Sequence, residues 1–257
     1  MDMQEPARFL TIPGAPARRI AYRKLEGRGP EIVWLGGFMS DMRSGKAEAL
    51  AEWAAGEGRA FLRFDYSGHG ESDGDFRDGT ISQWRDDALA VIDNLTSGPP
   101  LLIGSSMGGW IALLIARLLR ADDRPLAGMM LIAPASDFTE AQMWPQFPEH
   151  VKRAIMEDGV WLRPSAYGEP YPITRGLIED GRKNLILGAP FETGCPVHIL
   201  QGRHDPDVPW RHAQKLAEHL PLDDVTLTLI EDGDHRLSRD QDIALLIRTV
   251  AAMAEGE

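Results

Sequence analysis

A Gly-x-Ser-x-Gly pentapeptide at residues 104–108 constrains the fold of this chain more than any other feature. An apolar run, Leu101–Ile103, leads into it, and an apolar-periodic segment that begins at Met107 follows at once. This order predicts a strand, a sharp turn and a helix, with Ser106 at the turn in a strained backbone conformation. Larger side chains at the two glycine positions would collide with neighbouring strands. The turn would lift the serine oxygen clear of the sheet and aim the N–H of Met107 at the same point.

The two other side-chain types that activate a serine lie downstream. A serine hydroxyl needs a base to take its proton, and the base needs an acid to orient it. Asp205 follows a strand predicted at Val197–Leu200, and His235 follows a strand predicted at Val225–Ile230. Ligands of open parallel sheets bind at the edge where the strands end, so we expect these groups to meet Ser106 there.

Alternating strand-like and helix-like segments predict an α/β fold, with a mostly parallel central sheet and helices on both faces. Phe9–Ile12 and Arg18–Tyr22 are expected to form a leading antiparallel pair. Parallel strands are expected at Ile32–Leu35, Ala60–Phe64, Leu101–Ile103, Met129–Ile132, Val197–Leu200 and Val225–Ile230, and helices at Lys46–Ala55, Ile81–Leu95, Met107–Leu119, Trp210–His219 and Gln241–Ala254.

Four motifs in order resemble the α/β-hydrolase family from end to end. The resemblance implies a triad of Ser106, His235 and Asp205. It also implies an oxyanion hole made by the backbone N–H groups of Phe38 and Met107. Beside the pentapeptide, the motifs are Glu31–Phe38, similar to the strand and oxyanion loop but with Gly36 in the place of a histidine; Phe64–Ser72, similar to the Asp-x-x-Gly-His-Gly-x-Ser turn; Gly202–Pro209, similar to the acid loop; and Gly233–His235, similar to the histidine loop.

Three segments resemble one branch of that family, the acyl-protein thioesterases and acyl-glucuronide esterases. They are Gly104–Trp110, Tyr167–Thr174 and Asp234–Arg236. The resemblance implies hydrolysis of a small-molecule acyl ester or thioester, or of an acylated protein, through an acyl-enzyme and without a cofactor. Peptidases, lipases, carbon–carbon bond hydrolases and acyltransferases of this fold stay open, as does a non-catalytic binding protein.

Several neighbouring residues compete for these roles. Asp205 lies in the register of the family's acid loop, whereas Asp207 is nearer the next helix and could cap it. Ser105 would point into the strand layer, Asp234 would be solvated, and His69 would be structural. The cluster of His204, Asp205, Asp207 and His212 matches no standard zinc spacing, so we expect no metal.

Residues 136–194 interrupt the alternation and are too long for a plain connection. The segment is rich in aromatic residues and proline, which predicts a small helical lid that supplies an apolar wall to the substrate pocket. Trp144 and Phe147 are expected to contact substrate, together with Phe38 and Met39 of the oxyanion loop. The alternative is that these aromatic residues only attach the insertion to the core.

Composition indicates an ordinary globular protein. The 257 residues, 43% of them hydrophobic, can bury one sizeable core, and we expect residues 1–257 to form a single domain. A net charge of −12 disfavours nucleic acids and anionic membranes, and no run reaches the roughly 18 apolar residues of a membrane helix. The single cysteine, Cys195, and an N-terminus without a targeting signal predict a cytoplasmic protein.

Overall fold

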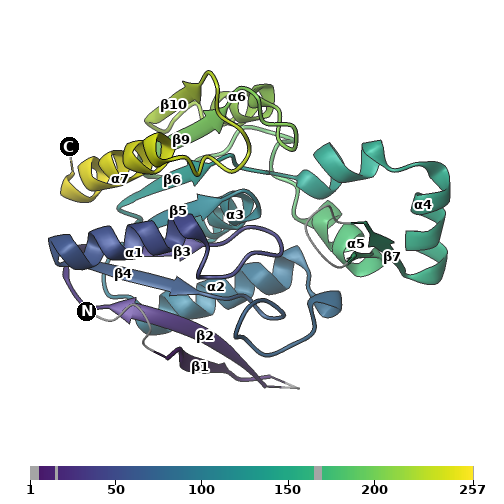
Figure 1. Cartoon of the computed structure of the whole chain (residues 1–257), viewed down its shortest axis with the longest axis horizontal. Helices are drawn as coiled ribbons and strands as arrows, with labels where there is room; N and C mark the ends of the chain where they lie inside the picture. Colours follow the sequence, from purple (N-terminus) through teal and green to yellow (C-terminus); the bar gives the residue numbers. More distant parts are fainter. Residues whose placement is uncertain (1–5, 15–16, 165–169, 257) are drawn as a thin grey trace.

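An eight-stranded sheet forms the centre of the computed structural model, which describes residues 6–14, 17–164 and 170–256 (Figure 1). The strand order is β1-β2-β4-β3-β5-β6-β9-β10. β1 and β2 are antiparallel, β2 runs antiparallel to β4, and all remaining pairs are parallel, so the expected mostly parallel sheet is confirmed. The strands are β1 (Arg8–Ile12), β2 (Arg18–Leu25), β3 (Arg28–Leu35), β4 (Arg59–Phe64), β5 (Leu101–Ser105), β6 (Gly128–Ile132), β9 (Val197–Gly202) and β10 (Val225–Ile230).

Helices cover both faces of this sheet. α1 (Gly45–Glu57) and α7 (Asp240–Glu255) pack on one face, while α2 (Ile81–Leu95), α3 (Met107–Ala121) and α6 (Trp210–Glu218) pack on the other (Figure 1). Along β5, Leu102 packs into the core beneath α2, α3 and α6, whereas Leu101 and Ile103 pack into the core beneath α1 and α7. Central strands buried on both faces read as continuous apolar runs, which is why the sequence shows them clearly. Among the helices of the described part of the chain, none combines the length and the hydropathy that a membrane span needs.

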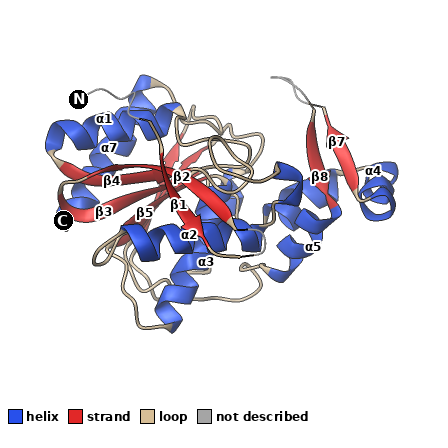
Figure 2. Cartoon of the chain, turned by 90° about the horizontal axis from the view of Figure 1, so that it is seen from below, coloured by secondary structure: helices blue, strands red, loops and turns tan. Residues whose placement is uncertain are grey.

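The segment between β6 and β9 folds beside the sheet as a separate layer. Figure 2 shows its short β7–β8 hairpin standing next to α4 and α5, away from the main strands. The expectation of a helical insertion missed this hairpin, because a four-residue run carries too little periodicity to distinguish strand from helix. Its elements are η2 (Thr139–Met143), η3 (Trp144–Gln146), α4 (Glu149–Arg153), η4 (Ala154–Asp158), β7 (Val160–Arg163), β8 (Tyr171–Thr174) and α5 (Arg175–Lys183).

Part of one sequence motif is not described. Residues 167–169, the first three of the Tyr167–Thr174 segment, lie outside the described residues. The remaining five residues lead into α5. Pro170 precedes β8, and Thr174 ends β8 and caps α5, because its hydroxyl oxygen accepts a hydrogen bond from the N–H of Leu177.

One carboxylate fastens the two ends of the insertion together. Asp137, near its start, accepts hydrogen bonds from the backbone N–H groups of Ile186 and Leu187, near its end, at 2.9 Å each. Asp137 is buried and has a positive φ of 57°. Burial raises the pKa of this carboxyl, although the two N–H donors act in the opposite direction. The insertion therefore leaves and re-enters the sheet layer at one point.

The turn at Ser106 depends on glycine. Ser106 has φ 54° and ψ −115°, an unusual conformation for a residue with a side chain. A Cβ atom at Gly104 would lie 2.5 Å from the carbonyl oxygen of Gly108, and one at Gly108 would lie 2.1 Å from that of Leu35. α3 can therefore begin directly against the ends of β3 and β5 because neither glycine carries a side chain.

Gly108→Ala should lower the free energy of unfolding by about 3 kcal/mol or more, because backbone atoms cannot move out of the way of the new methyl group. Gly56→Ala is the matched control, since a Cβ there meets nothing within 4 Å and the position is helical. It should stabilise the chain by about 0.5–1 kcal/mol. Urea unfolding measures both. Equal stability of the two variants would contradict the close approach of α3 to β3.

Candidate active site

Three side chains from separate loops form one hydrogen-bonded chain. Ser106 precedes α3, His235 follows β10, and Asp205 follows β9. His235 Nε2 lies 3.1 Å from Ser106 Oγ, and His235 Nδ1 lies 2.8 Å from Asp205 Oδ2. An ionised carboxylate can only accept, so Nδ1 carries the proton and Nε2 presents its lone pair to the serine hydroxyl. This arrangement can remove a proton from Ser106.

Asp205 is buried and fully hydrogen bonded. Its Oδ1 accepts from the N–H groups of Asp207 and Val208 at 2.8 Å, and its Oδ2 also accepts from Gln201 Nε2 at 3.0 Å. Burial acts to raise the pKa of Asp205, but the bond from His235 and the backbone donors outweigh it. The pKa therefore lies below its usual value. The carboxylate is ionised at neutral pH and fixes the imidazole tautomer.

Gln201 is a site residue that the sequence analysis missed. It is completely buried at the end of β9, and its amide also donates to the carbonyl oxygens of Gly202 and Val208, at 3.1 and 3.0 Å. It thereby fixes the loop that carries Asp205. A polar residue directly after the apolar run Val197–Leu200 was the available signal, because a side chain of this kind needs partners if the strand continues into the core.

The loop that carries His235 is braced from both sides. Arg239 forms ion pairs with Asp232 and Asp242, and Lys46 of α1 donates to the carbonyl oxygen of Arg236. At its base, a Cβ atom on Gly202 would lie 2.4 Å from the carbonyl oxygen of Gly233, so the ends of the acid and histidine loops are in direct contact. Two of these contacts, from Lys46 and from Gly202, join residues far apart in sequence, and residue types alone did not reveal them.

The competing residues occupy other positions. Asp207 is exposed and lines the cavity. It does not cap α6, because the N-cap position of that helix is Pro209. Ser105 is buried within β5, and the exposed Asp234 accepts from the N–H of Leu237. The structure thus brings Asp205, and not Asp207, to the histidine.

Phe38 and Met107 lie beside the serine. The N–H of Ser40 donates to the carbonyl oxygen of Gly37 at 3.1 Å and so closes a turn. The N–H of Phe38 lies within this turn and does not take part in the hydrogen bond that closes it. Met107 is the first residue of α3, where backbone N–H groups have no partner within the helix. A Cβ atom on Gly37 would lie 3.5 Å from Ser106 Cβ, so this turn passes close to the serine.

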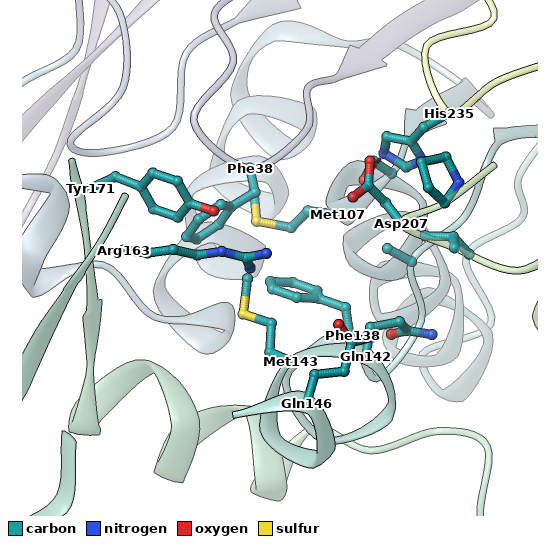
Figure 3. Close-up of a pocket in the computed structure, with 14 residues that line it drawn as sticks. Phe38, Met107, Phe138, Gln142, Met143, Gln146, Arg163, Tyr171, Asp207 and His235 are labelled. Carbon is teal, nitrogen blue, oxygen red and sulfur yellow. Dashed lines mark hydrogen bonds between the residues drawn. The ribbon is translucent and has the colours of Figure 1, made fainter. Parts of the chain in front are cut away.

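A cavity of about 210 Å³ opens in front of Ser106 and His235 (Figure 3). The insertion and the sheet edge both contribute to its wall. Polar and apolar groups share this wall, and one of the polar groups is the guanidinium of Arg163, which lies 5.9 Å from the centre of the Tyr171 ring. The apolar lining consists of Phe38, Met107, Ala135, Phe138, Met143, Tyr171, Pro206 and Val208, and the remaining polar lining of Gln142, Gln146 and Asp207.

Three residues expected at the substrate do not line this cavity. Met39 has 50% of its surface exposed to solvent and is not among the described residues that line the cavity. Phe147 is buried inside the insertion with its ring 5.3 Å from that of Trp161. Trp144 packs against Arg182, whose guanidinium lies 4.7 Å from the ring centre. Phe138 and Met143 take their place at the cavity, because the irregular π-helical and 3₁₀ turns rotate the chain in a way that no sequence period predicts.

Asp205, Asp207 and His235 are near enough to share a metal ion, with ligand atoms within 4.8 Å of one another. However, Asp205 and His235 are already bonded to each other, and the other Asp205 oxygen accepts two N–H groups. A cation would have to break these bonds. His212 belongs elsewhere, since its Nε2 lies 2.8 Å from the carbonyl oxygen of Ser136. A metal-free site stays a prediction.

Comparisons with known proteins point to one family. The α/β-hydrolase family described as serine aminopeptidase, S33, matches residues 32–176. The human mitochondrial palmitoyl-protein thioesterase ABHD10 is 36% identical over 244 residues, which cover 94% of this chain and 78% of the relative. Among solved structures, a hydrolase from Agrobacterium vitis S4 is 47% identical with a TM-score of 0.91, covering 97% of this chain and 100% of that one. Mouse alpha/beta hydrolase domain-containing protein 10 is 32% identical with a TM-score of 0.85, covering 97% and 99%.

Asp205→Asn should destabilise the fold at neutral pH, because it removes the charge that four donors stabilise. The pKa of Asp205 in the folded chain lies below the ordinary value of an aspartate. Its contribution to stability is therefore fully present above that ordinary value and is lost as the pH falls through the folded value. Urea unfolding of both proteins at a series of pH values should give stabilities that converge in that acidic window. A difference that does not change with pH would contradict an ionised Asp205.

Proposed function

Because this chain belongs to the α/β-hydrolase family, we propose that it is a serine hydrolase that cleaves carboxylic esters or acyl thioesters. One observation carries the proposal: the hydrogen-bonded chain of Ser106, His235 and Asp205 stands at the wall of a cavity that apolar side chains line in part. A nucleophile, a base and an orienting acid in that geometry are what acyl transfer requires.

In the proposed reaction, His235 Nε2 takes the proton of Ser106 as Oγ attacks the acyl carbon. The carbonyl becomes an oxyanion, which the N–H groups of Phe38 and Met107 receive. Asp205 holds the tautomer of His235 and stabilises the imidazolium that forms. His235 then gives its proton to the departing alcohol or thiol, leaving an acyl-serine. A water molecule, deprotonated by His235, then attacks the acyl carbon. The bond from that carbon to Ser106 Oγ breaks, His235 returns the proton to Oγ, and the acid is released.

The apolar part of the cavity supports an acyl group as the portion of the substrate that is recognised. Phe38 from the oxyanion turn, Phe138 and Met143 from the insertion, and Tyr171 from β8 form its wall. In our proposal, residues 136–194 act as a lid over the nucleophile within a single domain of residues 1–257. The relative named palmitoyl-protein thioesterase supports an acyl thioester, carried by a small molecule or by a protein.

The location of this activity is a separate question. We retain the cytoplasm as the proposed site, on the grounds of a single buried cysteine, Cys195. The curated relatives are named as mitochondrial proteins, which does not support that location. The net charge of −12 supports a substrate that is neither nucleic acid nor an anionic membrane surface.

Ser106→Ala should leave the chain folded and lower kcat for ester hydrolysis at least about a thousandfold, because none of the other described side chains that line the cavity replaces the nucleophile. Asp205→Asn should cost orders of magnitude, whereas Asp207→Asn should be mild because His235 Nδ1 bonds to Asp205 and not to Asp207. A panel of p-nitrophenyl esters, acyl thioesters and aminoacyl p-nitroanilides measures this. Turnover of the anilides alone would indicate a peptidase, and turnover of nothing in a folded protein would indicate a binding protein.

Met143→Ala should reduce the preference for long acyl chains over acetate, measured as the ratio of kcat/KM values, by roughly tenfold. Each buried methylene is worth about 0.8 kcal/mol, and this variant removes contacts made only with longer chains. Trp144→Ala is the matched control, since the neighbouring residue faces Arg182 and not the cavity. The ratio should not change in that variant. Equal effects in both, at near-native melting temperatures, would remove the insertion from the acyl-binding wall.

A further inference from the structure

The turn that carries Phe38 is held by side chains of β4 and the loop after it. The N–H of Met42 donates to Asp65 Oδ1 at 2.7 Å, and Arg63 Nη1 donates to the carbonyl oxygen of Met42 at 2.9 Å. Closer to the serine, the N–H of Met39 donates to His69 Nε2 at 3.3 Å. This last bond acts on the residue that directly follows Phe38. Met39 also has a positive φ of 56°, a conformation that a residue with a side chain adopts only when its surroundings impose it.

The contacts of the His69 ring define its protonation. Its Nδ1 lies 3.3 Å from the carbonyl oxygen of Ser67, which can only accept, so Nδ1 carries the hydrogen. Nε2 is then left with a lone pair, as the bond from Met39 requires. His69 is 95% buried, and burial lowers its pKa despite the Ser67 carbonyl and the nearby charge of Asp87. The ring is therefore neutral at neutral pH, and Nε2 is an acceptor.

The same aromatic cluster fixes His69 and Phe38. The His69 ring meets the rings of Phe76 and Trp84 edge-on, at 5.0 and 5.1 Å between centres. The Phe38 ring meets the same two rings at 5.0 and 5.9 Å. Edge-to-face packing of this kind restricts the rotation of each ring. The lone pair of Nε2 is thus held at a constant position relative to the turn.

We propose that His69 is a positioning residue for the oxyanion hole: its Nε2 fixes the peptide group after Phe38, the N–H of Ser40 holds the carbonyl of the peptide group before it, and the two together set the direction of the Phe38 N–H. This proposal rests on the proposed function, because it gives the Phe38 N–H the oxyanion as its partner. His69 does not touch the substrate, since it is absent from the described lining of the cavity. Its effect should therefore fall on the transition state, where the oxyanion develops, and not on substrate binding.

Two substitutions separate the acceptor from the ring. In His69→Gln the side-chain oxygen reaches the position of Nε2, whereas in His69→Asn it reaches only that of Nδ1. Loss of a complete oxyanion donor costs about 10²–10³ in kcat, so a misdirected donor should cost roughly 10- to 100-fold. We expect that loss for His69→Asn on p-nitrophenyl acetate, with KM changed by less than about threefold, and recovery of most of the kcat in His69→Gln. Equal losses in both variants, or no loss in His69→Asn, would overturn the proposal.

A second readout does not depend on turnover. Hydrogen exchange of the Met39 amide, followed by NMR, should be slow in the wild-type chain and in His69→Gln and fast in His69→Asn. Equal exchange in all three would overturn the role of His69 even if the enzyme were active. Ser106→Ala, measured in the same assay, tests the proposed function separately. If the wild-type chain hydrolyses esters no faster than this variant, the proposed function is wrong. The exchange data then still decide whether His69 holds the turn. The wild-type ring can be examined directly by ¹⁵N NMR, in which a protonated Nε2 would overturn the proposal.

Discussion

The close approach of α3 to the ends of β3 and β5 is the constraint on which the site depends. Because Gly104 and Gly108 have no side chains, the first turn of the helix lies directly against strand carbonyl groups. The chain can make that approach only by forcing Ser106 to a positive φ. The strain is compensated by the surrounding sheet, whose parallel strands lead the other functional loops to the same edge. Moving the helix outward would separate the serine from every group that serves it.

Buried carboxylates hold the irregular loops around this edge. Loops lack the regular hydrogen-bond partners of a sheet, so their N–H groups must find other acceptors when they are buried. Asp205 accepts N–H groups of the acid loop, Asp65 those of Met42 and Glu71, and Asp87 that of Ser67. Burial raises the pKa of Asp65 to about 6, even though its two N–H donors lower it. Burying the charged carboxylates costs free energy, but their hydrogen bonds fix the positions of the loops.

The sequence predicted well what depends on local chemistry or on a short period. The central strands are continuous apolar runs, and the turn at Ser106 is encoded by two glycines four residues apart, so both could be read directly. The positions of Trp144 and Phe147 could not be predicted, because π-helical and 3₁₀ turns change which residues face inward. The contact of His69 could not be predicted either, since its partner, the N–H of Met39, lies 30 residues earlier in the chain, and the type of Gln201 indicates a need for partners without naming them. What such residues contact is decided by tertiary packing.

The Asp137 clamp has a consequence for how this architecture can vary. Its bonds to Ile186 and Leu187 bring the two ends of the insertion together at the sheet layer. The connection between β6 and β9 is therefore closed at that point, whatever the length of the chain beyond it. The entropy cost of closing a loop rises only slowly with its length. Residues between the clamp points can therefore be lengthened, shortened or replaced with little penalty to the sheet. In such a chain, the part that shapes the cavity wall can diverge while the part that holds the nucleophile stays constant, and new acyl preferences become accessible without rebuilding the catalytic centre.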